Sequence, residues 1–182
     1  MSIDTMLDEL VRREGDYSDH PADRGGPTRW GVTEQVARAY GYKGDMRALP
    51  RQTAIDIYRQ RYWLGPRFDQ VAAVSPALAE ELFDTGVNMG PAVATKFLQR
   101  ALNLLNRQAT DYPDIAADGQ IGPMTIAALK SYAGKRGAAG LAVLLRLVDC
   151  FQAVRYAEIA EKNPSQEDFF FGWIANRTGP LK

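Results

Sequence analysis

The stretch that decides how the chain begins to fold is LVRREGDY, residues 10–17. It ends a row of apolar side chains with the spacing of one helix face, formed by Ile3, Met6, Leu7, Leu10 and Val11. The next position in this row is 14, where the pattern predicts a hydrophobic side chain and the sequence has a glutamate. We therefore predict a helix over residues 3–14, capped by Ser2 and ended by Gly15, with a carboxyl group aimed at the protein interior.

Glu14 is predicted to lie where two effects favour the protonated acid over the carboxylate. The C-terminus of a helix carries the negative end of the helix dipole, and an apolar face excludes water from a carboxylate. A carboxylic acid that keeps its proton near neutral pH is the group that a glycosidase uses as general acid. The alternative, which the sequence leaves open, is a Glu14 side chain that reaches solvent from a frayed helix end.

The loop after Gly15 contains the residue types of a carbohydrate site. Tyr17 and Trp30 offer flat apolar faces that can lie under sugar rings. Asp23 suits a base or an electrostatic stabiliser, and Thr28 offers a hydroxyl that can position water. The structural alternatives also stay open, because Asp23 can bind the amides of a turn and Trp30 can belong to the core.

Periodicity and capping residues predict a mainly α-helical protein. After the first helix, the expected helices cover residues 34–40, 51–63, 76–89, 92–109, 124–133 and 138–162. A short hairpin is expected around Gly25–Gly26, and a loop over residues 110–123. Thr33 is a candidate for substrate binding, with the N-terminal cap of the helix that follows as its alternative role.

Composition limits the class of function. The chain has 182 residues, with 22 Lys and Arg and 22 Asp and Glu, and this zero net charge argues against a nucleic-acid binder driven by bulk charge. A single histidine and a single cysteine exclude a disulfide within the chain and zinc sites that need several such ligands. Cys150 lies in an apolar run, which predicts a buried and inert thiol.

The N-terminal segment does not resemble a secretory signal, because it carries acidic residues and has no apolar h-region. The most apolar run, residues 141–154, is interrupted by Arg146 and Asp149 and is too short to span a bilayer. We expect a protein made in the cytoplasm, without stable insertion into a membrane.

The segment EGDYSDHPADRGGPTRWGVT, residues 14–33, resembles the signature of the phage-type muramidases of glycoside hydrolase family 108. Its usual form is Glu-Gly-Gly-Tyr, followed by Asp, Gly-Gly, Thr and Gly-Ile-Thr, so that Asp16 stands here in place of the second glycine. The resemblance implies that Glu14 is the catalytic acid. The spacing from Glu14 to Asp23 is also similar to that of the Glu–Asp–Thr triad of T-even-phage-type lysozymes, with Thr28 as the nearer candidate for the threonine and Thr33 as the alternative.

Four later segments extend the resemblance. AIDIYRQRYW, residues 54–63, is similar to a family helix that packs beneath the site. LFDTGVNMG is similar to a Phe-Asp-x-x-Val-Asn-x-Gly segment of the family, which makes Asn88 a candidate sugar contact or, alternatively, a helix-end residue. The segment from Asp118 to Thr125 resembles a turn of helical peptidoglycan-binding modules. The C-terminal FFFGWIANR, with Phe171 and Trp173, looks like the end of such a binding region. The alternatives are a purely structural turn at Asp118 and aromatic side chains that belong to the core.

The resemblance implies a lysozyme-like, mainly α-helical hydrolase with a short hairpin at its active site. Residues 1–90 would form the catalytic region, and residues 91–182 a helical peptidoglycan-binding region packed on it, with one compact body as the alternative. The expected reaction is hydrolysis of the β-1,4 bond between N-acetylmuramic acid (MurNAc) and N-acetylglucosamine (GlcNAc). A lytic transglycosylase and a non-catalytic peptidoglycan-binding protein are the alternatives.

The resemblance also sets expectations about partners and setting. It implies an endolysin that reaches the cell wall after release by a holin. The expected partner is bacterial peptidoglycan, and neither a metal nor a cofactor nor a nucleic acid is expected. The chain is expected to be a monomer.

Overall fold

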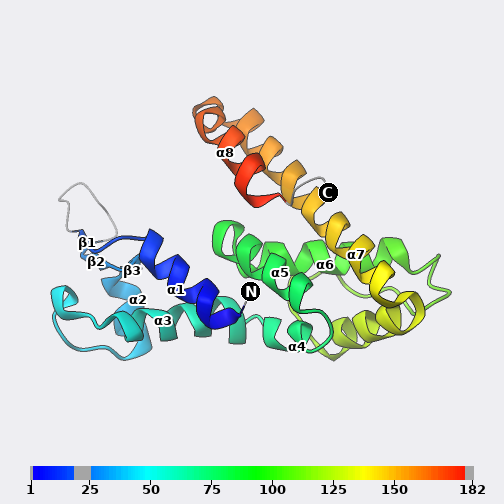
Figure 1. The fold of residues 1–182 in the computed structure, drawn as a ribbon, viewed down its shortest axis with the longest axis horizontal. Coiled ribbons are helices and arrows are strands. Elements are labelled where there is room, and N and C mark those ends of the chain that lie inside the picture. The colour runs from blue at the N-terminus through cyan, green and yellow to red at the C-terminus, as the bar shows by residue number, and fades with distance from the viewer. Residues whose placement is uncertain (1, 19–25, 179–182) are drawn as a thin grey trace. The chain divides into compact units, whose positions relative to one another are not determined.

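The structure, a computed structural model, describes residues 2–18 and 26–178 and divides into two compact units, residues 1–65 and residues 66–182. Both units are mainly helical, and a small antiparallel sheet belongs to the first (Figure 1). This confirms the predicted fold class, a mainly α protein with a short hairpin after its first helix. Asp23 and Gly25, on which parts of the prediction rest, lie outside the described residues.

The described residues of the first unit form five helical elements and three two-residue strands. Its elements are α1 (Ile3–Arg13), β1 (Tyr17–Ser18), β2 (Thr28–Arg29), β3 (Val32–Thr33), α2 (Glu34–Tyr40), the 3-10 turn η1 (Met46–Ala48), α3 (Arg51–Arg59) and the π-helical turn η2 (Gln60–Leu64). Helix α1 packs against α3, and Leu7 and Val11 of α1 are completely buried. Because burial of each such side chain contributes about 1.5–3 kcal/mol, this face holds α1 in place.

The start of α1 is as predicted. The Ser2 hydroxyl accepts a hydrogen bond of 3.2 Å from the Thr5 amide, and the helix ends before Gly15, which adopts φ +80°. An ion pair of 2.6 Å between Arg51 and Asp8 also links α1 to α3. Since both side chains of this pair are solvent-exposed to a large extent, it contributes much less than the buried apolar face.

The sheet has the order β1-β2-β3, and each neighbouring pair is antiparallel. Strands β2 and β3 are joined by Trp30 and Gly31, which have φ values of 53° and 72°. Two successive residues with positive φ form the type of tight turn whose twist fits a hairpin. The sequence did not predict this second hairpin, because a tryptophan seldom occupies such a position.

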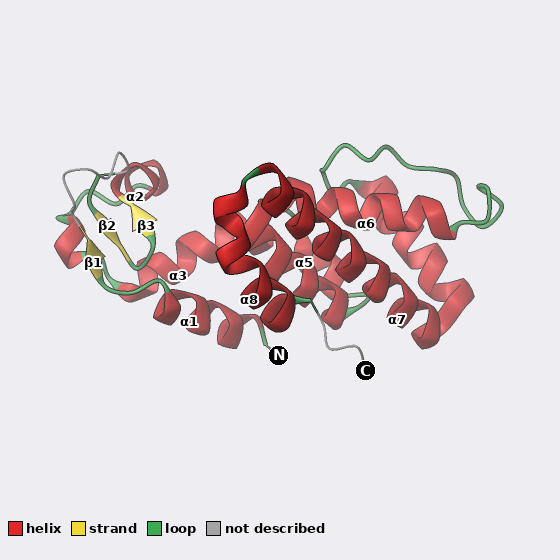
Figure 2. Cartoon of the chain, turned by 90° about the horizontal axis from the view of Figure 1, so that it is seen from above, coloured by secondary structure: helices red, strands yellow, loops and turns green. Residues whose placement is uncertain are grey.

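The second unit consists of helices α4 (Phe68–Ala72), α5 (Pro76–Met89), α6 (Pro91–Leu105), α7 (Pro123–Lys162) and α8 (Glu167–Arg177), with the 3-10 turn η3 (Pro164–Gln166). Helices α5, α6 and α7 pack on one another, and α8 runs beside the second half of α7 (Figure 2). Helix α5 begins as predicted, because the Ser75 hydroxyl accepts a hydrogen bond of 3.3 Å from the Leu78 amide and Pro76 takes the first helical position. The completely buried leucines of this unit are Leu78, Leu82, Leu98, Leu102, Leu129 and Leu144.

Helix α7 is interrupted at Gly137, whose φ of 59° and ψ of −159° are not helical. The two helices predicted over 124–133 and 138–162 are its two halves. The Tyr132 hydroxyl crosses the break and donates a hydrogen bond of 2.8 Å to the Gly140 carbonyl. Among the described residues α7 is the one helix long and apolar enough to cross a membrane by length and composition alone, which is weak evidence for such a role.

Two features of the second unit differ from the prediction. Cys150 is exposed, because it lies on the outer side of α7 while Val148 and Gln152 take the buried side. Helix α8 was not predicted, since its aromatic residues have no helical periodicity. It is held by ring stacking of Trp173 on Tyr156 of α7, with centroids 4.9 Å apart.

A chain of polar side chains crosses the interior between α5 and α7. Gln152, which is completely buried, donates a hydrogen bond of 2.8 Å to the Thr85 hydroxyl, and Thr85 donates one of 3.1 Å to Glu81. Glu81 also faces the carboxyl group of Asp149 on α7. Burial and then the charge of Asp149 raise the pKa of Glu81 to about 8, and burial raises the pKa of Asp149 as well. The two carboxyl groups therefore share a proton near neutral pH.

This carboxyl pair predicts that the protein becomes less stable as the pH rises from about 4.5 to about 8. The unfolded chain loses the Glu81 proton near its ordinary pKa of 4.5, whereas the folded chain keeps it up to about pH 8. The unfolded state binds fewer protons in this range, so unfolding becomes easier by up to about 1.4 kcal/mol for each unit of pKa difference. Urea unfolding followed by circular dichroism at pH 5 and pH 8 measures the difference.

The Glu81→Gln variant removes the titrating group and keeps the shape, so its stability is expected to change much less between the two pH values. Glu161→Gln, at an exposed position of α7, is the control and should behave like the wild type. Asp84, Arg177 and Tyr156 also face this cluster and are left unchanged in both variants. An equal pH dependence in wild type and Glu81→Gln would contradict the prediction.

Candidate active site

Glu14 closes α1 as its C-terminal cap, and its amide donates a hydrogen bond of 3.2 Å to the Leu10 carbonyl. Its side chain is exposed, so the prediction of a buried, water-excluded carboxyl group was wrong. The apolar face of α1 is buried as far as Val11, and the chain turns away at Gly15 before the next turn of the helix could be covered. The alternative reading, a side chain that reaches solvent from the end of the helix, describes its exposure correctly.

One side of Glu14 is nevertheless packed against the hairpin turn. A Cβ atom added to Gly31 would lie 2.9 Å from both Cβ and Cγ of Glu14 and 2.3 Å from the hydroxyl of Tyr58. The end of α1, the turn between β2 and β3, and the side chain of Tyr58 on α3 therefore meet at Gly31. Glycine is required at position 31 for two reasons. Its φ of 72° is unfavourable for other residues, and there is no room for a side chain.

Tyr58 is the residue of this site that the sequence did not reveal. The periodicity of residues 51–63 predicts the place of Tyr58 on one face of this helix, with Ala54 and Ile57, and the structure confirms that face as buried, but its approach to Glu14 was not predicted. Its side chain is buried, and burial followed by the negative charge of Glu14 raises the pKa of its hydroxyl well above the ordinary value of 10. Tyr58 therefore remains a neutral phenol next to the base of the Glu14 side chain.

The two predicted aromatic contacts both lie in the sheet region and are half-buried. Trp30 donates an indole hydrogen bond of 3.1 Å to the Leu49 carbonyl, and the Arg29 guanidinium lies 5.3 Å from the centre of its ring. Tyr17 pairs with Arg29 across β1 and β2, and the Arg47 guanidinium lies 5.4 Å from its ring centre. These contacts fix the orientation of both rings, and their role in substrate binding stays a prediction.

The two candidate threonines are partners in the sheet, because Thr28 of β2 pairs with Thr33 of β3. The Thr28 hydroxyl donates a hydrogen bond of 3.2 Å to the Gly26 carbonyl. The Thr33 hydroxyl accepts one of 3.4 Å from the Val36 amide and thereby caps α2. Which threonine takes part in a reaction stays a prediction, and Asp23, the proposed base, lies outside the described residues.

The remaining candidates belong to the second unit. Asn88 is exposed near the end of α5 and donates a hydrogen bond of 2.7 Å to the Asp84 carbonyl. Phe171 is exposed on α8, whereas Trp173 is half-buried against Tyr156. Thus Phe171 alone of the two aromatic side chains is presented openly to solvent.

Asp118 organises the turn that follows the loop after α6. Its carboxylate accepts hydrogen bonds of 2.9 Å from the buried side chain of Gln99 and from the Gln120 amide. The Gln99 side chain also accepts a hydrogen bond of 2.9 Å from the Gly119 amide. The hydrogen bond from Gln99, followed by that from the Gln120 amide, lowers the pKa of Asp118. Asp118 thus has the structural role that the sequence left open, and its contact with peptidoglycan stays a prediction.

Residues 7–90 match the family model described as Glycosyl hydrolase 108, and residues 93–178 match the one described as Predicted Peptidoglycan domain. The chain carries a glycosyl hydrolase 108 domain followed by a peptidoglycan domain. Among solved structures it is similar to "Structure of Brucella abortus SagA", with 26% identity, a TM-score of 0.62 and coverage of 95% of this chain and 87% of that one. No curated protein matches the chain.

The family matches and the compact units divide the chain at different places. The two family models meet between residues 90 and 93, whereas the units divide between Gly65 and Pro66. The glycosyl hydrolase 108 match therefore includes all of α4 and α5, which pack within the second unit. The predicted division into a catalytic region 1–90 and a binding region 91–182 is one of function, and it stays a prediction.

The contact at Gly31 predicts that this position of the glycosyl hydrolase 108 domain tolerates no side chain. Gly31→Ala should cost about 1–2 kcal/mol for the left-handed backbone and about 1–3 kcal/mol more for overpacking against Tyr58 and Glu14. Gly26→Ala is the matched control, because Gly26 also has a positive φ of 68° but has nothing within 4 Å of an added Cβ atom. Urea unfolding measures both losses.

The double variant Gly31→Ala/Tyr58→Phe tests the cause of the additional loss. Removal of the phenol oxygen opens space for the new methyl group, so the double variant should be less destabilised than the sum of the two single changes. Equal destabilisation by Gly31→Ala and Gly26→Ala, or strict additivity in the double variant, would show that the close approach of Tyr58 and Glu14 to Gly31 does not affect the free energy of unfolding.

Proposed function

We propose that this glycosyl hydrolase 108 protein is an endolysin-type muramidase that hydrolyses the MurNAc–GlcNAc β-1,4 bond of peptidoglycan with Glu14 as general acid. The observation that carries the proposal is the position of Glu14 within the matched domain. It stands at the end of α1 with one side packed on Gly31 and its carboxyl end open to solvent. The peptidoglycan domain that follows supports peptidoglycan as the substrate.

An exposed carboxyl group suits a substrate that is a polymer. A glycan strand cannot enter a closed pocket, so the acid must stand where the strand can lie across it. Bound sugar then replaces the water around the carboxyl group and favours its protonated form. Cβ and Cγ of Glu14 lie against Gly31, so the base of this side chain is placed beside the hairpin turn before the substrate arrives.

In the proposed reaction Glu14 donates its proton to the glycosidic oxygen. The bond between this oxygen and the anomeric carbon breaks, the GlcNAc hydroxyl leaves with the proton, and positive charge develops on the MurNAc ring. A water molecule adds to the anomeric carbon, and its proton passes to a carboxylate, for which Asp23 is our candidate. Thr28, or Thr33 in its place, would hold this water, and the rings of Tyr17 and Trp30 would support the sugars, with Asn88 as a further sugar contact.

Delivery to the wall is part of the proposal. We infer synthesis in the cytoplasm and release by a holin, as the likeness to phage muramidases suggests. Expression of the chain in a bacterial host with and without a co-expressed holin tests it. Lysis that needs the holin supports this route, and lysis without it contradicts it.

The central test is the Glu14→Gln variant, which keeps the shape of the side chain and removes the proton. Loss of a general acid costs about 10²–10⁴-fold in rate, so clearing of a peptidoglycan suspension should fall by at least two orders of magnitude. Glu9→Gln is the matched control, since Glu9 lies on the same helix and pairs with Arg13 at 3.6 Å. Near-normal activity of Glu14→Gln would remove Glu14 from its proposed role.

Mass spectrometry of the released fragments decides the type of reaction. A muramidase leaves MurNAc with a free reducing end, whereas a lytic transglycosylase leaves an anhydro sugar that is lighter by one water. Binding to the wall without any released fragment would identify a non-catalytic binding protein. Either of the last two results would overturn the proposed hydrolysis.

A further inference from the structure

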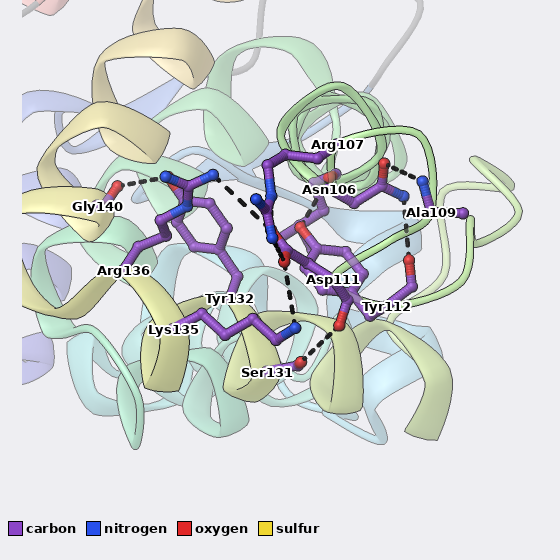
Figure 3. A network of polar contacts seen from close by, with 11 residues as sticks. Asn106, Arg107, Ala109, Asp111, Tyr112, Ser131, Tyr132, Lys135, Arg136 and Gly140 are labelled. Carbon is purple, nitrogen blue, oxygen red and sulfur yellow. Dashed lines mark hydrogen bonds and ion pairs between the residues drawn. The ribbon is translucent and has the colours of Figure 1, made fainter.

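Three basic side chains of the second unit surround one carboxylate. Asp111 forms an ion pair with Arg107, which lies in the same loop between α6 and α7. It forms two more with Lys135 of α7 at 3.1 Å and Arg136 of α7 at 3.8 Å (Figure 3). The Asp111 side chain is only 3% exposed, whereas the three basic side chains are between 44% and 62% exposed. The hydrogen bonds from Arg107 and Lys135 lower the pKa of Asp111, so this carboxylate stays ionised.

The charges of this cluster do not cancel. One carboxylate faces three cations, and even with Asp114, which accepts a hydrogen bond of 2.6 Å from Asn106, the positive charge exceeds the negative by one. Guanidinium groups can bind a second carboxylate through donors that the first does not use. The cluster can therefore hold an anion from solution without losing Asp111.

The backbone that carries Arg107 is held in an unfavourable conformation. Arg107, Gln108 and Ala109 have successive φ values of 55°, 57° and 60°, a left-handed turn that costs about 1–2 kcal/mol for each residue. The buried Asn106 fixes this turn, because its side chain accepts a hydrogen bond of 3.0 Å from the Ala109 amide and donates one to the Tyr112 carbonyl (Figure 3). Such strain is retained where the surrounding structure enforces it, and it is frequent at binding sites.

Arg136 also borders a cavity of about 350 Å³ at the break of α7. The remaining lining residues are mostly apolar and come from α6 and both sides of the break: Leu105, Tyr132, Ala139, Gly140 and Val143. A cavity of this size with apolar walls and one basic side chain suits a small aliphatic group attached to an anion.

We propose that this cavity and the adjoining basic cluster, which reaches it through Arg136, bind the stem peptides of peptidoglycan through their free carboxylates. The choice of peptidoglycan rests on the proposed function, but the choice between its two components rests on the site. The glycan strand is neutral where the lactyl carboxyl groups of MurNAc are amide-linked to stem peptides, whereas the stem peptides carry free carboxylates next to the methyl groups of alanine. Excess positive charge beside a small apolar cavity matches the peptide and not the sugar.

The test is the binding of two soluble probes to the full chain, measured by calorimetry. One probe is the disaccharide with a tetrapeptide that has free carboxylates, and the other is the same molecule with its carboxylates amidated. Arg136→Gln removes one cation and leaves Arg107 and Lys135 on Asp111, and we expect it to weaken binding of the first probe at least about tenfold. The wild type should bind the amidated probe as weakly as this variant binds the first.

A second variant and a control distinguish loss of the binding site from loss of the folded structure. Val143→Glu places a negative charge at the exposed lip of the cavity without changing the Asp111 cluster, and it should weaken binding to a similar extent. Arg155→Gln is the control, because Arg155 lies on the same helix, is about as exposed, and pairs with Glu158 at 2.8 Å. Its binding should equal that of the wild type.

Two outcomes overturn the proposal. The first is equal binding of the free and amidated probes by the wild type. The second is unchanged binding in Val143→Glu and Arg136→Gln, with both variants folded. A failure of this site would leave wall lysis by the wild type intact, and a failure of the muramidase proposal would leave stem-peptide binding intact, because binding is measured without turnover.

Discussion

The approach of three elements to Gly31 is the constraint on which the candidate active site depends. Glu14 at the end of α1, the turn between β2 and β3, and Tyr58 of α3 come so close there that no side chain fits. The helices are held together by buried apolar residues such as Leu7 and Val11, and this packing is what brings the turn to the acid. The position of the carboxyl group therefore follows from core packing of the first unit, even though the group itself lies in solvent.

The sequence predicts well those features that depend on neighbours along the chain. Caps at Ser2 and Ser75, and the helix end at Gly15, follow from local hydrogen bonding and backbone freedom, and the structure has them where they were expected. The break of α7 at Gly137 belongs to the same class. Features that depend on distant segments were missed or wrong: the exposure of Glu14, the approach of Tyr58, and the hairpin turn at Trp30, which is stabilised by a contact with the Leu49 carbonyl.

The second unit is held together in part by buried polar side chains whose partners could not be predicted from the sequence. Gln99 ties the Asp118 turn to α6, Asn106 fixes the left-handed turn before Asp111, and Glu81 shares a proton with Asp149 inside the helix packing. The networks of Gln99 and Glu81 join segments that lie far apart in sequence, whereas the Asn106 network is local. The periodicity of the sequence indicates none of the three. Polar networks of this kind are costly when incomplete, and they select one packing of the helices over its alternatives.

The interruption at Gly137 divides α7 into two helical segments, one before and one after this residue, which we call its first and second rod. The first rod, up to residue 136, carries Lys135 and Arg136, two of the three basic side chains at Asp111. The second rod supports α8 through Tyr156 and Trp173. A residue inserted into the second rod would rotate everything beyond it by about 100° and leave the first rod in register. Such an insertion before Gln152 would also turn this buried side chain away from Thr85 of α5, so the length of the second rod is fixed by its packing on α5, while the Asp111 surface before the break would stay in register.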